Sequence, residues 1–472
     1  MSQILYDRTS KDSILAYARM LLGKSIHDLH PDAKTLNSGK GDLGQCVEVH
    51  HFGYDINGNA EADFNEAGLE LKCTPLKLLQ EGSMVSKERL VLNIINYVEE
   101  FDKTFNTSSF THKNALLLLM FYLHIKGVDK LDLLFKIIRL WSIPEEDLKI
   151  FMDDWNVIHE KIANGLAHEL SEGDTLYLAA CVKGTKGGAN KKPQKVGGVL
   201  ADQRAYSIKS AYLNHIIVDS LSHPEMCDGV KMTAKQRRAI EKKKAKIGNV
   251  VRSVNDYRRG ETFEQLVERR FRPYIGMTVG SISDSLHVKV STSPKAISYS
   301  VCRAILGVKE RSIAEFEKAG LILKTIRLEQ NGNLKEAMSF QTIKYNDIVD
   351  EDEWEDSDWY QTIAARRFLF IVFRKKKGGT PSDAILERVF FWAMPFVDIP
   401  KAMELWRDTR DKVRDGDYSH FLKMSEHTVC HIRPKAKNAT DMMNTPQGGK
   451  AQKYCWWLNR DYVLSVVREH MR

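Results

Sequence analysis

The chain carries an internal repeat with a very long period, and this repeat limits the folds that the chain can adopt. A shift of 252 residues aligns FNEAGLELKCTPL (64–76) with FEKAGLILKTIRL (316–328). Nearly the same shift pairs the apolar run ALLLLMFY (115–122) with RFLFIVFR (367–374), and Trp155 with Trp406. Solenoid repeats have much shorter periods, of about 20 to 50 residues. The sequence therefore predicts one whole domain in two copies.

The order of local patterns is the same in both copies. A helix with apolar periodicity comes first, a second helix is expected around residues 41–53 of the first copy, and apolar or alternating runs then predict strands. Further helices are expected around Trp155 and Trp406. We therefore predict an α/β (mixed α+β) fold with two tandem domains, each a central mixed sheet flanked by helices. The expected limits are 1–228 and 263–472.

Residues 229–262 join the two predicted domains and are strongly basic. Their central part contains a dense block of lysine and arginine that includes Lys242, Lys243 and Lys244. Such a block is typical of a solvated linker helix, and it is also compatible with an arm that follows the phosphates of a nucleic acid. Both interpretations stay open at this point.

Charge and composition narrow the class of protein. The net charge of +8 and the pI near 8.9 are compatible with a polyanionic partner. No run of apolar residues is long enough for a membrane-spanning helix, and the first residues lack the apolar core of a signal peptide, so we expect a cytoplasmic protein. The seven cysteines form no CxxC pair, which argues against a structural zinc site.

The stretch ADFNEAGLELK (62–72) places two carboxylates and an ammonium close together. Side chains alternate along a strand, so Glu70 and Lys72 share one face while Leu69 and Leu71 face the core. A turn between Asp63 and Glu70 can bring Asp63 beside them. Two neighbouring carboxylates raise each other's pKa unless a cation is present, and Mg²⁺ prefers such oxygen ligands. The pattern predicts a Mg²⁺ site at Asp63 and Glu70 for phosphodiester hydrolysis, with Lys72 beside the reacting water.

The second copy keeps the apolar frame of this stretch but loses part of its chemistry. Lys324 stands opposite Lys72, whereas Ile322 stands opposite Glu70 and Glu315 opposite Asp63. An amphipathic edge strand would also carry a solvent-facing Glu and Lys, so the tripeptide alone is weak evidence. The selective loss of an acid indicates one catalytic and one non-catalytic copy.

These residues resemble a known family. DFNEAGLELKCTP is similar to the D-x6-E-x-K signature of the MutH-like nucleases in the PD-(D/E)xK superfamily, and SKERLVLNIINY (86–97) resembles the GATC-cutting type II restriction endonucleases of that group. The resemblance implies that Glu48 and Lys113 complete the catalytic set of Asp63, Glu70 and Lys72. It also implies that Lys40 contacts DNA. Ala62 replaces the family's proline.

In the second copy the resemblance points to substitutions and to a DNA-reading loop. Cys302 stands opposite Glu48, and Ala365 opposite Lys113. The stretch HIRPKAKNA (431–439) resembles the family's reading loop. The DNA-binding residues that the resemblance implies are Arg433, Pro434 and Lys435, with Lys183 and Lys186 in the first copy. Arginine can bind guanine with two hydrogen bonds, although a loop that only contacts phosphates is the alternative.

Three other patterns are less specific. GKGDLG (39–44) matches a dinucleotide-binding motif, but no buried strand precedes it, which argues against such a fold. His50 and His51 are expected to be surface or packing residues, because adjacent helical residues cannot both face one metal ion. The acidic run DIVDEDEWEDSDWY (347–360) is typical of a solvated loop, and a DNA mimic is the alternative.

The resemblance implies a Mg²⁺-dependent type II restriction endonuclease that cuts double-stranded DNA at GATC, 5′ to the G. The expected partners are duplex DNA with two GATC sites and a cognate DNA methyltransferase; no membrane is expected. We expect a monomer in solution that can dimerise on DNA. The alternatives are a MutH-type mismatch-repair nicking endonuclease and a DNA-binding regulatory protein without catalytic activity.

Overall fold

The computed structural model describes residues 6–36, 41–54, 61–79, 82–184, 190–227, 246–291, 293, 296–435, 438 and 441–471. The chain folds into two compact units. The first unit comprises Met1–Leu170, Leu176–Ile247 and Glu317–Ala319, and the second comprises Ser171–Thr175, Gly248–Phe316 and Gly320–Arg472. The predictions for Lys40, Lys186 and the three central linker lysines lie outside the described residues. The predicted domain limits stay a prediction.

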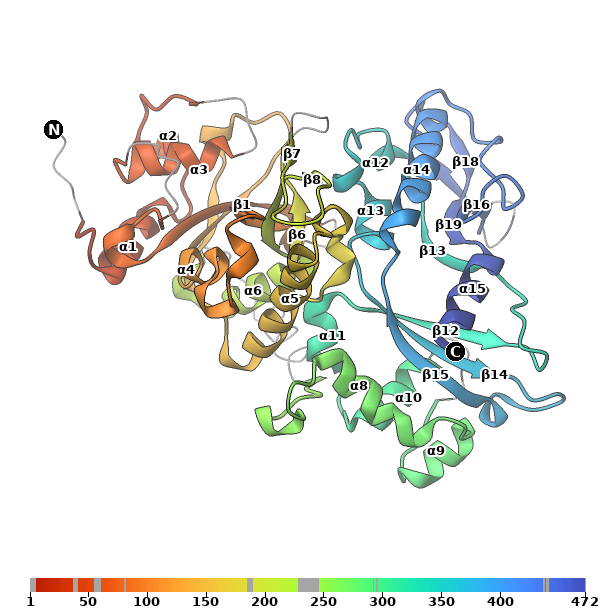
Figure 1. Ribbon diagram of the computed structural model, residues 1–472. Coiled ribbons are helices and arrows are strands. Elements are labelled where there is room, and N and C mark those ends of the chain that lie inside the picture. Colours follow the sequence, from red (N-terminus) through yellow and green to blue (C-terminus); the bar gives the residue numbers. More distant parts are fainter. Residues whose placement is uncertain are drawn as a thin grey trace. The chain divides into compact units, whose positions relative to one another are not determined.

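The first unit contains a mixed sheet and a smaller antiparallel sheet (Figure 1). Its strands are β1 (Glu70–Leu78), β2 (Met84–Ser86), β3 (Leu90–Ile94), β4 (Leu117–Leu123), β5 (Phe135–Trp141), β6 (Leu178–Val182), β7 (Lys191–Lys192), β8 (Ala201–Asp202) and β9 (Arg204–Ile208). The mixed sheet has the order β2-β1-β4-β5, with β1 parallel to β4, and the antiparallel sheet has the order β3-β9-β6. The predicted central mixed sheet is confirmed.

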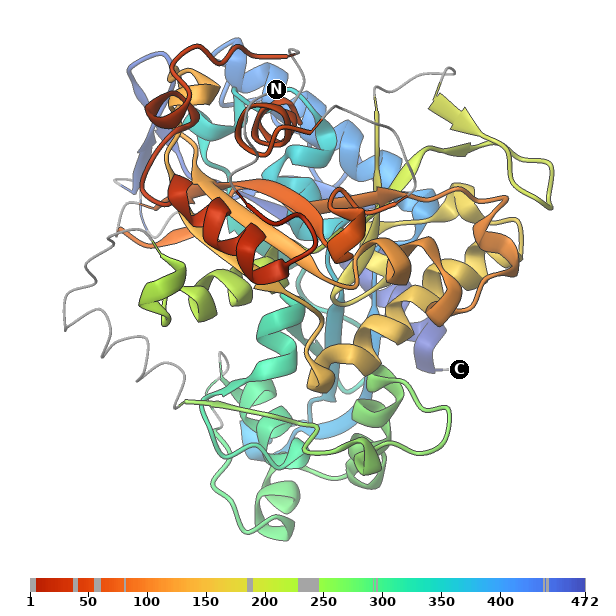
Figure 2. The same cartoon turned by 90° about the vertical axis from the view of Figure 1, so that its left-hand side faces the viewer.

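Helices cover the sheets of the first unit. They are α1 (Lys11–Ala18), α2 (Ile26–Leu29), α3 (Asp42–Cys46), the π-helix η2 (Val47–His51), α4 (Ser109–Lys113), α5 (Glu145–Ala163) and α6 (Ser210–Ser220). Figure 2 shows α1, in red, lying over the orange strands of the mixed sheet. Ile14 of α1, Leu43 of α3 and Leu71 of β1 belong to one buried cluster, so the apolar face of β1 is packed under these helices.

The second unit repeats this arrangement. Its strands are β12 (Ile322–Leu328), β13 (Met338–Thr342), β14 (Phe368–Arg374), β15 (Ile385–Trp392), β16 (Cys430–Pro434), β17 (Met442–Asn444), β18 (Lys450–Gln452) and β19 (Tyr454–Leu458). Its helices are α8 (Phe263–Phe271), α9 (Val279–Ser285), α10 (Ile297–Leu306), α12 (Tyr345–Ile348), α13 (Asp358–Ile363), α14 (Ile399–Arg414) and α15 (Arg460–Met471). Three further short elements are β10 (Ile247–Gly248), β11 (Ser312–Ile313) and α11 (Ala314–Ala319).

Strand pairing shows that the two units are copies of one fold. β12 runs parallel to β14 and pairs Ile322 with Phe368, just as β1 runs parallel to β4 and pairs Glu70 with Leu117. The antiparallel sheet β13-β19-β16 has the connectivity of β3-β9-β6. Even the irregularities recur, because β4–β5 and β14–β15 each contain a register shift in the second half of the strand pair.

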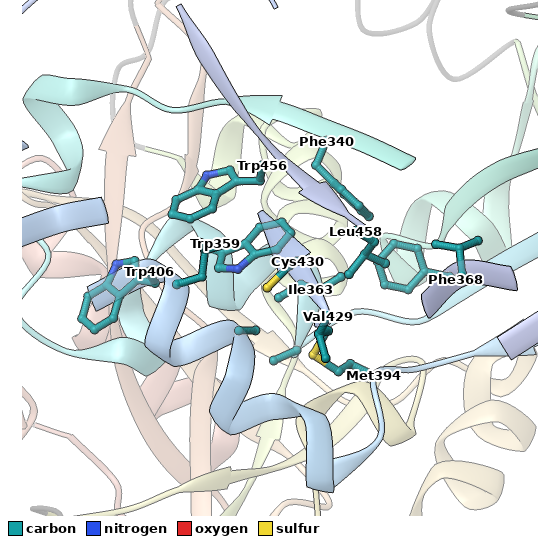
Figure 3. Packing of buried hydrophobic residues seen from close by; sticks show 14 of the residues in the cluster. Phe340, Trp359, Ile363, Phe368, Met394, Trp406, Val429, Cys430, Trp456 and Leu458 are labelled. Carbon is teal, nitrogen blue, oxygen red and sulfur yellow. The ribbon is translucent and has the colours of Figure 1, made fainter. Parts of the chain in front are cut away.

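The core of the second unit lies between its antiparallel sheet and its helices. Figure 3 shows Trp456 and Trp359 close together, with Phe340 and Leu458 beside them. The rings of Trp359 and Trp456 are stacked with their centroids 4.9 Å apart. Alternate residues of β13, β16 and β19 therefore face this core, and the residues between them lie on the opposite face of the sheet.

The acidic run 347–360 fits the expectation of a solvated loop only in part, because its acids are mostly exposed while its aromatic residues are packed. Trp354, Trp359 and Tyr360 are all buried in the core of the second unit. Glu351 accepts a hydrogen bond of 2.6 Å from the indole N–H of Trp406. The aromatic residues interleaved with the acids decide this outcome, because their burial outweighs the cost of placing a few carboxylates at the edge of a core.

In the described part of the chain, no helix is long and apolar enough to cross a membrane.

Candidate active site

Asp63 is brought beside the start of β1 by a tight turn. A 3₁₀ helix covers Asn65–Ala67, and Gly68 follows it with φ of +61°, a conformation that side chains with a Cβ adopt rarely. The Asp63 carboxylate accepts a hydrogen bond of 2.9 Å from the backbone N–H of Leu71. The backbone N–H of Asp63 donates to the Glu70 carboxylate at 3.2 Å. The predicted turn is confirmed, and it fixes the two acids in one place.

Glu70 and Lys72 lie on the same face of β1 as predicted, and Glu70 is only 1% exposed. The Lys72 ammonium donates a hydrogen bond of 2.5 Å to Glu70 Oε1. Lys113, the last residue of α4, brings a second ammonium to 3.8 Å from the same oxygen. Two lysines from distant parts of the sequence therefore converge on one buried carboxylate.

Glu48 completes the cluster from the π-helix η2. Burial raises the pKa of Glu48 to about 7; the Asp63 and Glu70 charges also raise it, and Lys72 and Lys113 oppose them. Glu48 therefore lies within electrostatic reach of all four other residues of the predicted catalytic set. π-helical turns inside α-helices are frequent at functional sites.

The charges of this cluster do not balance in a buried place. Burial also raises the pKa of Glu70, and the Asp63 charge adds to that shift while Lys72 opposes it. Three carboxyl groups thus share a site with two ammonium groups. A divalent cation would lower the cost of ionising all three acids, so the donor set of oxygen ligands fits a hard metal ion.

Another group of potential ligands lies elsewhere on the first unit. Within the described residues, His27, Asp129 and Asp132 place one ligand atom each within 4.8 Å of one another. The His27 ring bonds Asp132 at 2.7 Å, and both aspartates are exposed. This trio is an exposed ion pair with a neighbouring acid, and it shares no residue with the predicted catalytic set.

The second copy keeps the geometry of the motif but uses its residues differently. Gly320 has φ of +60°, matching Gly68. Glu315, opposite Asp63, accepts hydrogen bonds of 2.9 Å from the backbone N–H groups of Val250 and Val251. Lys324 donates to the backbone carbonyl of Ser339 at 2.7 Å. The counterpart of an acid in the predicted catalytic set thus supports the backbone in the second copy.

Contacts between helix and strand support the predicted equivalence of Glu48 and Cys302. In the first copy, Gly44 of α3 lies against Cys73 of β1, since a Cβ placed on Gly44 would be 3.8 Å from the Cys73 Cβ. In the second copy, the Ser298 hydroxyl of α10 forms a hydrogen bond of 2.6 Å with the Thr325 hydroxyl of β12. Counting forward four residues from Gly44 and Ser298 gives Glu48 and the buried Cys302.

The counterpart of Lys113 changes by one residue. Lys113 precedes the paired Leu117 by four residues, and four residues before Phe368 is Ala364 rather than the predicted Ala365. An alanine stands there in either case, so this end of the site carries no ammonium in the second copy.

The predicted reading loop begins at the end of β16. Arg433, Pro434 and Lys435 are exposed. The Arg433 guanidinium lies 5.3 Å from the ring centroid of Trp457, and the Lys435 ammonium lies 5.5 Å from it. In the first copy the position of Arg433 is the buried Cys181, and Lys183 follows it, exposed, after β6.

Trp457 and Ser339 belong to this surface and were missed from the sequence. Trp457 pairs with His431 on one side and with Ser339 on the other. Lys435 donates a hydrogen bond of 2.7 Å to the Ser339 hydroxyl. Alternation in YCWWL could have shown that Trp456 and Trp457 face opposite sides, but only strand pairing reveals the partners.

His50 and His51 are packing residues, as expected. The His51 ring is stacked on Tyr17 with centroids 4.5 Å apart, and its Nε2 lies 3.1 Å from the Tyr17 carbonyl. His50 Nε2 lies 2.8 Å from the Lys34 carbonyl. Neither ring belongs to the carboxylate cluster.

Comparisons with known proteins agree with this geometry. The family model for the DNA mismatch repair enzyme MutH matches residues 52–154 and again residues 306–404. The type II restriction enzyme Sau3AI of Staphylococcus aureus is 31% identical over 484 aligned positions, which cover 96% of this chain and 93% of that enzyme.

Shorter relatives match less than half of the chain. The DNA mismatch repair protein MutH of Shewanella sp. (strain W3-18-1) is 22% identical over 214 residues, covering 43% of this chain and 92% of that protein. MutH of Shewanella woodyi is 29% identical over 148 residues, covering 30% of this chain and 61% of that protein. Both the duplicated architecture and the full-length similarity lead to one conclusion: the chain belongs to the MutH-like type II restriction endonucleases.

Proposed function

We propose that the first unit hydrolyses one phosphodiester in each strand of duplex DNA at GATC, 5′ to the G, in a reaction that requires Mg²⁺. The observation that carries this proposal is the convergence of Glu48, Asp63, Glu70, Lys72 and Lys113 in the first unit, together with the loss of two of the three acids from the same framework in the second. The sequence GATC and the position of the cut rest on resemblance to the family.

Asp63 and Glu70 are the residues that would hold the metal ion, because their carboxylates are fixed beside each other by the turn at Gly68. When bound, Mg²⁺ supplies a Lewis acid for the phosphate and an activated water. The unbalanced charge of the cluster supports this assignment, since buried acids with raised pKa values gain most from a cation.

The two lysines would orient the nucleophile and stabilise charge on the phosphate. Lys72 is held by its bond to Glu70, and Lys113 approaches from the end of α4, so both ammonium groups are positioned before substrate arrives. Donors that are fixed in advance lower the barrier because they need no reorganisation during the reaction. Glu48 is proposed to tune this site by its charge.

We propose that the second unit binds DNA without cutting it and activates the first unit, so that the enzyme engages two GATC sites. Arg433, Pro434 and Lys435 are the proposed contacts there, and Lys183 is proposed for the first unit. Lys40 and Lys186 keep this proposed role as well. A cognate methyltransferase would protect the host's own sites, and we propose a cytoplasmic monomer that dimerises on DNA.

The test is digestion of unmethylated plasmid with purified full-length protein and Mg²⁺, followed by mapping of the ends. Double-strand breaks 5′ to the G of GATC are expected, with no reaction in EDTA. Nicks confined to one strand would favour a MutH-type repair endonuclease instead. Binding without any cleavage would favour a regulatory DNA-binding protein.

A further inference from the structure

The second unit gathers cations on one face of its antiparallel sheet. Phe340, Trp456 and Leu458 face the core (Figure 3), so Ser339 and Trp457 face the other way. Arg433 shares this outer face, because it lies two residues beyond His431, the strand partner of Trp457. We call the surface formed by Ser339, Arg433, Lys435 and Trp457, together with Lys324 of β12, whose ammonium reaches the Ser339 carbonyl, the basic face.

Two ammonium groups of the basic face meet on a single residue. Lys324 donates to the Ser339 carbonyl at 2.7 Å, and Lys435 donates to the Ser339 hydroxyl at the same distance. The Lys324 ammonium also lies 4.0 Å from the centroid of the Phe340 ring. Burial lowers the pKa of Lys324 to about 8, and the charge of Lys435 acts in the same direction.

No acid in the described residues pairs with these cations. The ion pairs of the described residues include neither Lys324 nor Arg433 nor Lys435, whereas Lys72 in the first unit is paired with Glu70 at 2.5 Å. The reason is Ile322, which stands where Glu70 stands in the first copy. Converging cations without a counter-ion repel one another, and an anion bound between them would relieve this repulsion.

The equivalent face of the first unit has the two lysines but not the arginine. Strand pairing places Val91, Ala179, Cys181 and Ser207 where the second unit has Ser339, His431, Arg433 and Trp457. Lys72 and Lys183 stand where the second unit has Lys324 and Lys435, and Lys72 is paired with Glu70. Arg433 and the loss of the acid at position 322 are therefore particular to the second copy.

From these observations we propose that the basic face is a metal-independent phosphate site, in which Lys324, Arg433 and Lys435 together bind a backbone phosphate of duplex DNA. The inference rests on the proposed DNA binding of the second unit and deepens it. The lysine of the former catalytic motif is reused: without Glu70's counterpart, its charge is available to the DNA. Phosphate contacts position a protein on DNA without reading its sequence.

The test measures binding of full-length protein to a fluorescent GATC duplex in EDTA over a salt series. Lys324→Met, Arg433→Met and Lys435→Met should each weaken binding about tenfold and lower the slope of log K against log[salt] by about one. Lys324→Met and Lys435→Met should weaken binding to a duplex of equal length without GATC by the same factor. Lys401→Met, which removes an exposed charge from α14 of the same unit, is the matched control.

The decisive variant is Ile322→Glu, with Ile322→Leu as its control. A carboxylate at position 322 would pair with Lys324 as Glu70 pairs with Lys72, so Ile322→Glu should weaken binding in EDTA while Ile322→Leu leaves it unchanged. Equal binding by the two variants would overturn the inference. If Lys324→Met lowers the unfolding temperature, the inference is tested instead with Lys435→Met and with Lys324→Arg. Lys324→Arg should retain binding.

Cleavage of plasmid by the wild type in Mg²⁺ is measured alongside. If the wild type cuts the plasmid and all variants bind DNA in EDTA as the wild type does, the phosphate site would be rejected and the nuclease proposal would stand. If the wild type cuts no DNA and the variants lose DNA binding in EDTA, the result would support the phosphate site and reject the nuclease proposal.

Discussion

The two units share the strand orders β1-β4-β5 and β12-β14-β15 in their mixed sheets, yet they retain different parts of the motif. What both keep is the framework: the left-handed glycine at Gly68 and Gly320, the parallel pairing of the motif strand, and a tyrosine hydroxyl (Tyr97, Tyr345) that donates to a backbone carbonyl at 2.5 Å. What differs is the charge placed on that framework. The shared fold therefore depends on glycine, apolar residues and buried hydrogen bonds, and it tolerates the loss of two of the three acids.

Glu315 illustrates how a carboxylate survives after its chemistry is lost. It is 7% exposed and accepts hydrogen bonds from two backbone N–H groups. Buried N–H groups without a partner destabilise a protein by roughly 1–3 kcal/mol each, which gives a physical reason to keep an acid there. Nothing comparable supports an acid at position 322, where Ile322 contacts the apolar core.

The largest effect is expected when Glu70 is removed from the first unit. Glu70→Ala should reduce single-turnover plasmid cleavage by more than about a thousandfold, because the metal ion and Lys72 both lose their partner. Binding to a GATC duplex should persist. Glu66→Ala, an exposed acid on the same turn, is the control and should cut normally. Cleavage by Glu70→Ala at a near wild-type rate would remove Glu70 from the site.

A second test asks whether the second unit acts as an effector. A plasmid with two GATC sites should be cut about tenfold faster than a plasmid with one, because the tethered second site has a high effective concentration. Arg433→Ala should abolish this advantage, whereas Arg460→Ala, an exposed arginine on α15, should preserve it. Equal rates on the two plasmids with the wild-type protein would show that the second unit is no effector.

A third prediction concerns acid stability, in which the helix η2 and its counterpart α10 should differ. Burial lowers the pKa of His51 to about 4, below the ordinary value of 6.5. The counterpart of His51 in the second copy is Ile305, which follows Cys302 by three residues as His51 follows Glu48. As pH falls below 6.5, His51 becomes protonated in the unfolded chain but stays neutral in the folded chain. The contribution of His51 to the free energy of unfolding should therefore fall by up to about 1.4 kcal/mol per pH unit until pH approaches 4, and it should be fully present above pH 6.5. Glu48, whose pKa burial raises to about 7, acts in the opposite direction, so the contribution of His51 is the difference between the wild type and His51→Gln.

Hydrogen exchange of the full-length protein can follow this difference. From pH 7 to pH 5, peptides covering η2 should lose more protection in the wild type than in His51→Gln, after correction for the intrinsic rate, while peptides covering α10 should show no such difference. His50→Gln should behave like the wild type. Identical behaviour of η2 in the wild type and in His51→Gln would contradict the assignment to His51.

The smallest predicted effect concerns two equivalent helix caps, one in each unit. Ser108 caps α4 and Ser357 caps α13, with φ and ψ of −71° and 153° in the first and −69° and 149° in the second. Each hydroxyl accepts from a backbone N–H, at 3.2 Å and 3.1 Å. Ser108→Ala and Ser357→Ala should each destabilise the protein by about 1 kcal/mol in denaturant unfolding. Costs that differ by more than about 1 kcal/mol would show that the caps are not equivalent.

Much of the fold and part of the site could be predicted from the sequence. The repeat, the mixed sheets, the turn before β1 and the shared face of Glu70 and Lys72 follow from local patterns, because strand alternation and glycine conformations are set by neighbouring residues. The acidic run was predicted only in part. Its acids are mostly exposed, as expected, but Trp354 and Trp359 are buried, and composition alone does not show where a segment packs.

That one copy carries the full acid set and the other does not can be read from the sequence, since Ile322 and Cys302 cannot supply a carboxylate in any fold. The contacts between segments distant in sequence depend on the tertiary structure. The approach of Lys113 to Glu70 depends on the packing of α4 against the sheet, and the meeting of Lys324 and Lys435 on Ser339 depends on the pairing of β13 with β19. Charges separated by tens of residues interact only after the strands between them have paired, and that pairing is a property of the whole core.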